Sequence, residues 1–443
     1  MPHNAHICPR FIRCFTSALL AVLVFALPTL AADTTVIGTG SPTQDVPNVQ
    51  AAVDKGGTLL LKGKFNFGSE GRVKITKNIR ISGETDSVGE PKTTITGGFW
   101  TLYAPLPYKD APPSDKGPIV AVSSIRFDGA KGTPLHFPHV SGLDVRGCTV
   151  TDVIPQQVDI EWAEGDSLAF QAGIIVGNRI VHTKGPLKKA ASGTIRIENN
   201  RFFMENKRPD TTAGFGVLTD WTTGAEITIK DNIILRTSRN GIEVLDNTRD
   251  AKGNGSITIS GNRITTDEEG IPYPHKYGPN GIVAGWYFDT RGGADFSRNN
   301  RIAITGNRVE GRGDASTGIL LYANDIVATC NDVIMGGGVS ARGIVQTGSR
   351  GFFANNRVRG EARYALYCYP FESLKATANT FAWTELNDFT GIKGQVLLGG
   401  QVNVVVGGVP SLLDKGKGNR VVDTPPCALP EVDPEGESWE PVE

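Results

Sequence analysis

Hydrophobic and polar residues alternate along this chain in a short phrase that is written several times. The pattern I-x-I-x-x-N-x-(apolar) occurs as IRIENNRF (195–202), ITIKDNII (227–234), ITISGNRI (257–264) and IAITGNRV (302–309). Looser copies are IVATCNDV (326–333), FFANNRV (352–358) and LKATANTF (374–381). Alternation with a period of two predicts half-buried strands rather than helices.

The asparagine of the phrase gives the length of the repeat. It falls at Asn200, Asn232, Asn262, Asn307, Asn331, Asn356 and Asn379, at intervals of 32, 30, 45, 24, 25 and 23 residues. Because the shortest intervals cluster near 24, the longer ones are interpreted as one repeat plus an insertion.

A second phrase, a small residue followed by an apolar alternation, lies between successive asparagines. It occurs as FGVL (215–218), NGIEV (240–244), NGIVA (280–284), TGILL (317–321), RGIVQ (342–346) and YALYC (364–368). Two kinds of strand are therefore expected to alternate. The segment GIIVGNRI (173–180) fits either phrase. The intervening segments are too rich in Gly, Asn and Asp to favour helices.

Short strands without helical crossovers exclude a doubly wound sheet and predict a coil of stacked rungs. Each inward Ile or Val then lies about 4.8 Å from its counterpart on the next rung. The asparagine is expected at a sharp turn, where its amide bonds the amides of the rungs above and below.

This pattern resembles the right-handed parallel β-helix proteins of the pectin-lyase-like superfamily, whose coils carry an asparagine ladder. The resemblance implies an all-β fold, a single-chain solenoid with a short N-terminal capping helix. It runs at least from Ile195 to Phe381, and IRFDG (125–129) and LDVRGCTV (143–150) extend it, with Cys148 at the asparagine position. The segment DVPNVQAAVDKGGTLLLKGKFNF (45–67) looks like the cap that such an open end requires.

Four segments are predicted along the chain. Residues 1–32 have the basic start, apolar run and small final residues of a signal peptide, and an uncleaved anchor is disfavoured by Pro28. Residues 33–70 form the cap and first rungs, and 71–421 the parallel β-helix, with QVNVVVGG (401–408) as its last rung. Residues 422–443 hold seven acidic residues and five prolines and are expected to be a solvated tail. We expect an exported protein, periplasmic or extracellular, with no membrane span after signal removal.

Charge and cysteine content exclude two classes of protein. The formal net charge is -1, with acidic and basic residues interleaved, so nucleic acid is not expected as a partner. Beyond the signal peptide four cysteines remain, Cys148, Cys330, Cys368 and Cys427, too few for a disulfide scaffold. One pair could still oxidise, and three pairings are open.

Candidate chemistry follows from the second phrase, because the resembled family binds substrate in a groove over the sheet that carries it. If Ile242 and Val244 point inward, Glu243 points outward. The same register places Leu218, Val283, Leu320, Val345 and Tyr367 outward, and two positions further on Asp220, Leu245, Gly285, Tyr322, Thr347 and Tyr369. Asp220 and Glu243 then lie on neighbouring rungs. Such a pair can divide acid and base roles, bind calcium or simply be solvated.

Two insertions flank the strand at Gly281 and account for the interval of 45 residues. They are TTDEEGIPYPHKYGPN (265–280) and GWYFDTRGGADFSRNNR (285–301), expected on opposite sides of one groove. The predicted catalytic residues are Glu243, His275, Lys276 and Arg291. The predicted substrate-binding residues are Asp220, Trp286, Tyr287, Asp289, Tyr322 and Tyr367. Lyases of the resembled superfamily use Lys or Arg as base, which suits Lys276 or Arg291. No cofactor is assigned, and calcium is the one candidate metal.

The sequence favours an exported carbohydrate-active protein that acts on an acidic polysaccharide by lyase, hydrolase or epimerase chemistry. Aromatic rings stack on sugars, and cations pair with uronate carboxylates. The alternative is a non-catalytic solenoid that binds a polysaccharide or cell-envelope glycan, which the outward Leu218, Val283 and Leu320 favour. The chain lacks the paired aspartates with Gly-His-Gly of polygalacturonases and the Asp-Pro-His-Asp of periplasmic alginate epimerases.

Overall fold

The computed structural model describes residues 34–105, 116–159, 167–177, 191–204, 213–245, 247, 255–266, 279–285, 301–338, 340–348, 351–368, 382–385, 387–389, 391–398, 404–406, 411–415 and 419–422. The predicted signal peptide, the tail from 423 onward and most of the two insertions, 267–278 and 286–300, lie outside these ranges. Among the residues that are described, no helix is long and apolar enough to cross a membrane.

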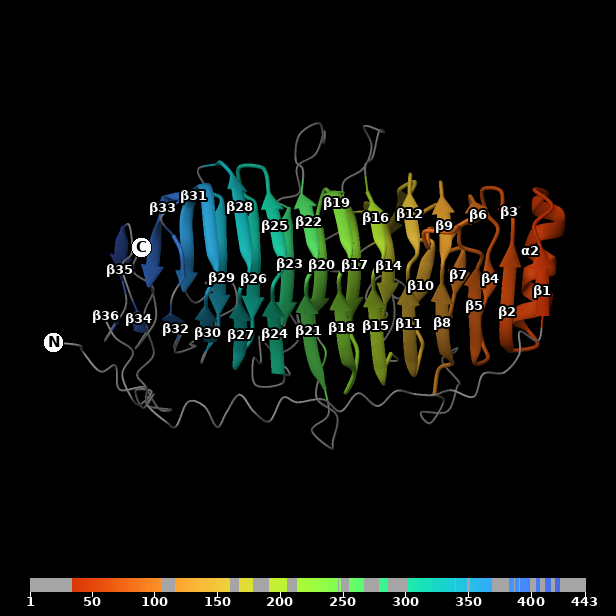
Figure 1. Cartoon of the computed structure of the whole chain (residues 1–443), viewed down its shortest axis with the longest axis horizontal. Helices are drawn as coiled ribbons and strands as arrows, with labels where there is room; N and C mark the ends of the chain where they lie inside the picture. Colours follow the sequence, from red (N-terminus) through yellow and green to blue (C-terminus); the bar gives the residue numbers. More distant parts are fainter. Residues whose placement is uncertain are drawn as a thin grey trace.

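The chain winds into an elongated stack of parallel strands, with one helix across the N-terminal end (Figure 1). The first ladder holds β1 (Thr34–Ile37), β2 (Gly57–Lys62), β5 (Ile79–Gly83), β8 (Ile119–Ser123), β11 (Gly142–Arg146), β15 (Thr194–Glu198), β18 (Glu226–Lys230), β21 (Ser256–Ser260), β24 (Arg301–Thr305), β27 (Ile326–Thr329), β30 (Gly351–Ala354), β32 (Ala382–Glu385), β34 (Val404–Val406) and β36 (Arg420–Val422).

Two further ladders complete each turn. The second holds β3 (Lys64–Asn66), β6 (Thr93–Thr96), β9 (Ile125–Asp128), β12 (Thr149–Thr151), β16 (Arg201–Phe203), β19 (Ile233–Thr237), β22 (Arg263–Thr266), β25 (Arg308–Gly311), β28 (Asp332–Gly336) and the start of β31 (Arg357–Cys368). The third holds β4 (Val73–Lys74), β7 (Leu102–Tyr103), β10 (Leu135–Phe137), β14 (Ser167–Val176), β17 (Ala213–Asp220), β20 (Asn240–Leu245), β23 (Asn280–Gly285), β26 (Thr317–Tyr322), β29 (Arg342–Thr347), the end of β31, β33 (Ile392–Leu398) and β35 (Leu412–Asp414). The strand β13 (Gln156–Asp159) pairs antiparallel with β14.

The predicted fold, an all-β right-handed parallel β-helix, is confirmed. The expectation of only two kinds of strand is wrong, because the first phrase bends at its asparagine. In ITISGNRI the residues before Asn262 form β21 in the first ladder, and those after it begin β22 in the second. The segment GIIVGNRI opens within β14, so its start belongs to the second phrase and the third ladder.

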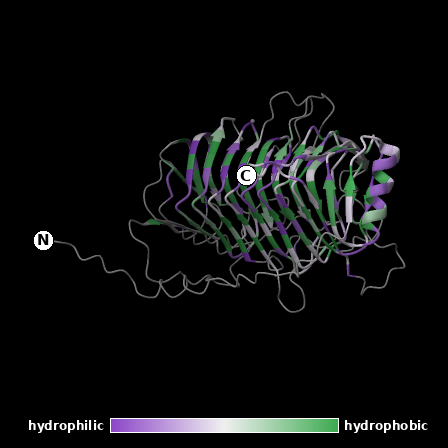
Figure 2. Ribbon diagram, turned by 45° about the vertical axis from the view of Figure 1, so that its right-hand side comes forward, coloured by the Kyte–Doolittle hydropathy of each residue, from purple (hydrophilic) through white to green (hydrophobic). Residues whose placement is uncertain are grey.

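The core is built from columns of like residues. Ile195, Ile227, Ile257 and Ile302 pair in direct register along the first ladder, and each is at most 2% exposed. Because Ile257 pairs directly with Ile302, the interval of 45 residues is one turn of the coil with insertions, as predicted. Figure 2 shows hydrophobic segments running along the strands for the length of the stack.

A ladder of buried asparagines fixes the turn between the first and second ladders. The Asn232 Nδ2 donates to Asn262 Oδ1 at 2.9 Å, and Asn262 Nδ2 donates to Asn307 Oδ1 at 2.9 Å. Each backbone N–H also donates to the next Oδ1, at 3.0 Å for both pairs. Cys148 takes the predicted place before Asn200, whose Oδ1 accepts from the Cys148 N–H at 2.9 Å.

The far end of this ladder differs from the prediction. The residue after Asn356 is Asn387, whose Oδ1 accepts from Asn356 N and Nδ2 at 2.9 Å each. Asn379 and its segment LKATANTF lie outside the described residues, and the prediction that Asn379 follows Asn356 in the ladder is wrong, because AWTE forms β32, the strand that pairs with β30. QVNVVVGG is not the last rung either, since Val405 in β34 pairs with Val421 in β36.

Glycines in the second phrase allow strands of the third ladder to pack closely against side chains of the second ladder and against the backbone of the next turn. A Cβ on Gly281 would lie 2.1 Å from Val309 Cγ1 and 2.5 Å from Gly318 O. Gly216, Gly241, Gly318 and Gly343 meet comparable obstacles. Glycine at these positions therefore reflects a close approach of chain to chain, and not a turn.

The helix α2 (Pro42–Val53) closes the N-terminal end, as predicted, and buries Val49, Ala52 and Val53. Asp45 ties the helix to the coil, because its carboxylate accepts hydrogen bonds from the N–H groups of Thr39 at 2.8 Å and Asn66 at 2.8 Å. In Figure 2 the helix presents both polar and apolar residues, as a cap between core and solvent must.

Substituting Asn262→Ala is expected to lower the free energy of unfolding by about 2–4 kcal/mol, because the buried Asn232 N–H and amide lose their acceptor. Urea unfolding followed by circular dichroism measures this loss. Thr258→Ala on the same turn, half-buried and outside the ladder, is the control and should change stability by less than about 1 kcal/mol. Equal losses in the two variants would contradict a special role for the ladder.

Candidate functional site

The outward positions of the third ladder form a continuous row along the coil, which we call the outer row. It consists of Lys74, Tyr103, His136, Ile175, Leu218, Glu243, Val283, Leu320, Val345, Tyr367, Leu397 and Leu413, each paired in register with the next. The register predicted from Leu218 to Tyr367 is confirmed. The second predicted set is also in register, from Asp220 through Leu245, Gly285 and Tyr322 to Thr347, while Tyr369 lies outside the described residues.

The middle of the outer row is buried. Glu243 is 4% exposed and Asp220 is 1% exposed, so the interpretation that these carboxylates are simply solvated is wrong. Ala172, Ile175, Phe215 and Leu218 form a hydrophobic cluster of their own, separate from the main core. A carboxylate beside such a dry surface interacts more strongly with its partners than one in water.

Each of the two carboxylates is held by an amide. The Asn240 side-chain amide donates to Glu243, and Asp220 Oδ1 accepts from the Leu245 N–H at 3.1 Å. Asp220 lies on β17 and Glu243 on the neighbouring β20, as predicted, but Asp220 pairs with Leu245 and is therefore diagonal to Glu243. The separation of about 7–8 Å between diagonal positions suits two groups that act on one substrate from different places.

An amide chain extends from Glu243 to the next rung. Asn280 Nδ2 donates to Asn240 Oδ1 at 2.8 Å, and Asn240 in turn donates to Glu243. The Oδ1 of Asn280 and the Oε1 of Gln171 are buried and have no hydrogen-bond partner among the residues that the structure describes. Buried acceptors of this kind are costly for stability, by about 1–3 kcal/mol each, and are candidates for binding a donor group of a ligand.

The other predicted site residues are placed as follows. Tyr322, 8% exposed, lies on β26, two strands from Glu243, and Tyr367 lies on β31, four strands from it. The structure thus brings Asp220 and Glu243 together and leaves the two tyrosines further along the same face. His275, Lys276, Trp286, Tyr287, Asp289 and Arg291 lie outside the described residues.

Aromatic rings and arginines gather at the C-terminal part of the outer row. The rings of Tyr364 and Tyr367 lie 4.9 Å apart between centroids. The Arg342 guanidinium lies 5.3 Å from the Tyr367 ring centroid, and that of Arg363 lies 5.1 Å from Tyr364. Such cation–π contacts hold cations at an apolar surface.

A second aromatic and cationic cluster lies at the N-terminal end of the row, and the sequence interpretation missed it. Arg72 lies over Phe99, Trp100 and Tyr103, and His136 meets the Trp100 ring edge-on with 4.4 Å between centroids. His136 is fully buried, and within the described ranges neither ring nitrogen has a hydrogen-bond partner. Burial, reinforced by the charge of Arg72, lowers the pKa of His136 to about 3.

Sequence signals for the missed residues were present but weak. Asn240 and Asn280 open the phrases NGIEV and NGIVA, where the repeated asparagine preceding the glycine marks a buried amide column. Arg72, Phe99, Trp100 and His136 come from three turns that do not carry the asparagine phrase. Only the alternation around LHF (135–137) indicates that His136 points outward.

Metal sites do not stand out in the part of the chain that the structure describes, and of its three cysteines Cys148 and Cys368 are buried whereas Cys330 is exposed. Within it, no group of three or more His, Cys, Asp or Glu side chains could hold a metal ion. Cys148, Cys330 and Cys368 are free thiols, while Cys427 lies outside the described residues. Burial raises the pKa of Cys148 and of Cys368 to about 12, which leaves both unreactive.

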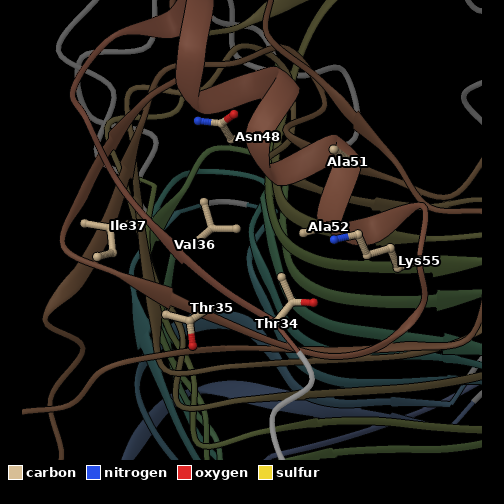
Figure 3. A pocket seen from close by; sticks show the side chains of 8 residues that line it. All are labelled: Thr34, Thr35, Val36, Ile37, Asn48, Ala51, Ala52 and Lys55. Atoms are coloured by element: carbon tan, nitrogen blue, oxygen red, sulfur yellow. The ribbon is translucent and has the colours of Figure 1, made fainter.

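An open hollow of about 410 Å³ lies at the N-terminal cap, away from the outer row (Figure 3). It is lined by Thr34, Thr35, Val36 and Ile37 of β1 and by Asn48, Ala51, Ala52 and Lys55 of the cap. Apart from Lys55 these side chains carry no charge. Thr34, Thr35 and Asn48 are polar, but the lining offers no acid–base pair for catalysis.

Comparisons with known proteins concern the fold. No family model matches the chain, and no curated protein matches it. The surface adhesin PfbA of Streptococcus pneumoniae is similar at 12% identity with a TM-score of 0.49, over 82% of this chain and 91% of that one. The A-module of the Azotobacter vinelandii mannuronan C-5 epimerase AlgE4 is similar at 13% identity with a TM-score of 0.43, over 82% and 95%. Endopolygalacturonase I of Stereum purpureum is similar at 10% identity with a TM-score of 0.27, over 88% and 98%.

These likenesses are too distant to assign a family or an activity. The resemblance to pectin-lyase-like proteins holds for the architecture, whose parallel ladders and asparagine column are present in this chain itself. Function has to be argued from the side chains of the outer row.

His136 is expected to make the protein less stable in mild acid. Its pKa is lower in the folded chain than the ordinary 6.5, so below that pH the unfolded chain binds a proton that the folded chain refuses. Between pH 7 and pH 5 the free energy of unfolding should fall by about 2 kcal/mol more in the wild type than in His136→Phe. Urea unfolding at both pH values measures the difference. Phe137→Leu, a buried neighbour without a titrating group, should shift stability equally at both, and an unchanged fall in His136→Phe would exclude His136 as the group.

Proposed function

We propose that this chain is an exported carbohydrate-active protein that binds an acidic polysaccharide along the outer row. The observation that carries the proposal is the arrangement of charge along that row. Cationic and aromatic clusters lie around Tyr103 and Tyr367, and the carboxylate of Glu243 lies between them. Export is supported by the signal-like composition of residues 1–32.

The geometry fits an extended ligand. From Tyr103 to Tyr367 the row has eight steps, with Glu243 four steps from either end. At about 4.8 Å a step, each cluster lies roughly 19 Å from Glu243. A polyuronate chain laid along the coil would therefore have cations near both ends, and it would reach the buried carboxylate at its middle once the groups that cover Glu243 move aside.

Glu243 is the residue we propose for the chemistry, as a general acid or base of a lyase, hydrolase or epimerase reaction. Asn240 orients its carboxylate, and the dry surface around Leu218 strengthens its interactions. His275, Lys276 and Arg291 are proposed as its catalytic partners, and Asp220, Trp286, Tyr287, Asp289, Tyr322 and Tyr367 as groups that bind the sugar chain. Calcium is the one metal we propose, as a bridging cation between carboxylates.

A second candidate function is glycan binding without turnover, as part of the cell envelope. The apolar residues that flank Glu243 in the row, Leu218, Val283, Leu320 and Val345, favour it. A catalytic floor usually presents several polar groups to the substrate, whereas the middle of this row, from Ile175 to Val345, holds one carboxylate among apolar side chains.

Incubation of the mature protein with polyuronates and neutral glycans distinguishes the two functions. Catalysis gives new reducing ends, an unsaturated product that absorbs in the ultraviolet, or altered uronate stereochemistry. Glu243→Gln is expected to lower kcat by about 100-fold or more. Glu226→Gln, an exposed glutamate of β18 on the first ladder, is the matched control and should leave the rate unchanged.

Further variants define the partners of Glu243. His275→Ala, Lys276→Ala and Arg291→Ala should each reduce the rate if both insertions border the groove. Unchanged rates in these variants and in Glu243→Gln would show that the reaction takes place elsewhere on the coil. Binding of a polyuronate with no product of any kind would favour the non-catalytic function.

A further inference from the structure

The cluster around Arg72 occupies one corner of three consecutive turns. Arg72 precedes the core residue Val73 at the start of the third ladder, and Phe99 and Trp100 occupy the same corner one turn later. Lys131 follows on the next turn, where its backbone bridges to Phe99. Tyr103 and His136 extend the cluster onto the outer row. The corner therefore leads directly onto the surface that we propose binds the sugar chain.

Aromatic rings hold the Arg72 guanidinium in one place. Its central carbon lies 4.5 Å from the ring centroid of Phe99, 4.7 Å from Trp100 and 5.2 Å from Tyr103. Its Nε donates a hydrogen bond to Phe99 O at 2.9 Å, which fixes the plane of the group. Among the described residues no acceptor bonds the two Nη nitrogens. The two Nη nitrogens of Arg72, which can donate two parallel hydrogen bonds to one carboxylate, are thus available for a ligand.

The environment of Arg72 favours an anion. Burial lowers the pKa of Arg72, while Tyr103 and Glu70 act in the opposite direction. Glu70 already pairs with Lys131, and Lys74 lies exposed two residues beyond Arg72 on the same face. The electrostatic attraction between a guanidinium and a carboxylate is stronger when the guanidinium is partly shielded from water than when it is fully hydrated.

Two features of the cluster are hard to explain by stability alone. His136 is fully buried beneath Trp100 with both ring nitrogens unpartnered. Trp100 has a φ of 50°, in the left-handed region that bulky residues rarely adopt. Strained backbone and unpaired buried polar groups tend to persist where a site has been shaped for a ligand.

We propose that Arg72, framed by Phe99, Trp100 and Tyr103, is a subsite that binds the carboxylate of a uronate unit at the N-terminal end of the outer row. The guanidinium Nη nitrogens donate to the two carboxylate oxygens, and Lys74 and Lys131 attract the polyanion toward the corner. This subsite rests on the proposed function, because it places one end of the acidic polysaccharide that Glu243 would meet about 19 Å further along.

Binding of a defined oligouronate by calorimetry tests the subsite, with a neutral oligosaccharide of equal length for comparison. Arg72→Ala is expected to raise the Kd for the oligouronate about 10- to 100-fold and to leave binding of the neutral oligosaccharide unchanged. Arg72→Lys keeps the charge over the rings but loses the fork, so its Kd should also rise, by less. Arg126→Ala, an exposed arginine of β9 on the second ladder, is the matched control and should bind as the wild type does.

A direct signal separates a binding role from a structural one. The Arg72 Nε resonance, assigned by its loss in Arg72→Lys, should shift as the oligouronate is added, also in Glu243→Gln. If the wild type binds the oligouronate and both Arg72 variants bind it equally well, Arg72 is structural and the subsite is wrong, while the proposed function stands. If the wild type binds no oligouronate at all, the proposed function fails, and the subsite fails with it.

Discussion

The structure depends on one constraint, the direct register in which each strand pairs with the strand one turn later. Because neighbouring rungs lie only about 4.8 Å apart, each side chain touches its counterparts above and below. Equivalent positions on successive turns therefore form a column of side chains in contact, and each column must hold residues that pack well against the same residue type. Isoleucine stacks in the core, as from Ile227 to Ile257. Buried asparagine satisfies its amide against the asparagine of the next turn, as between Asn232 and Asn262, and against a backbone carbonyl, as between Asn232 and Ile197.

Register also explains why long insertions do not disturb the coil. Ile257 pairs with Ile302 although 45 residues separate them, because a loop can leave and rejoin a turn at the same height. Loop closure adds little cost as length grows. The strand β23 stays in register with β20 and β26 although an insertion borders each of its ends. The paired strands therefore supply stability, while loops of different length and sequence can be inserted at the surface without disturbing them.

Most of the fold could be predicted from the sequence, because a column repeats its residue type at each turn. The prediction of the asparagine column is correct as far as Asn356. It misses Asn387, because LKATANTF matches the repeated phrase better than AWTELN, which contains Asn387, does. The second ladder was missed because its strands are as short as Arg201–Phe203, too short for alternation to show.

The candidate site was predictable only in part, for a different physical reason. Alternation gave the outward direction of Glu243, since that depends on its immediate neighbours. Its burial could not be predicted, because the exposure of an outward side chain depends on distant parts of the chain. The Arg72 cluster joins residues from three turns of unequal length, so no single phrase contains it.

Positions where a residue differs in type from the others in its column are consequently the most informative about function in this chain. If the outer row served only to cover the coil, apolar residues such as Leu218, Val283 and Leu320 would be expected at each of its positions. Lys74, Tyr103, His136, Glu243 and Tyr367 break that type, and three of these five lie within the two cation–π clusters. A buried carboxylate beside aliphatic neighbours carries a free-energy cost that the repeat does not require, and so does a buried imidazole whose nitrogens have no partner in the described part of the chain. Such residues near both ends and at the middle of one face fit a surface that recognises an extended, charged ligand, as we propose.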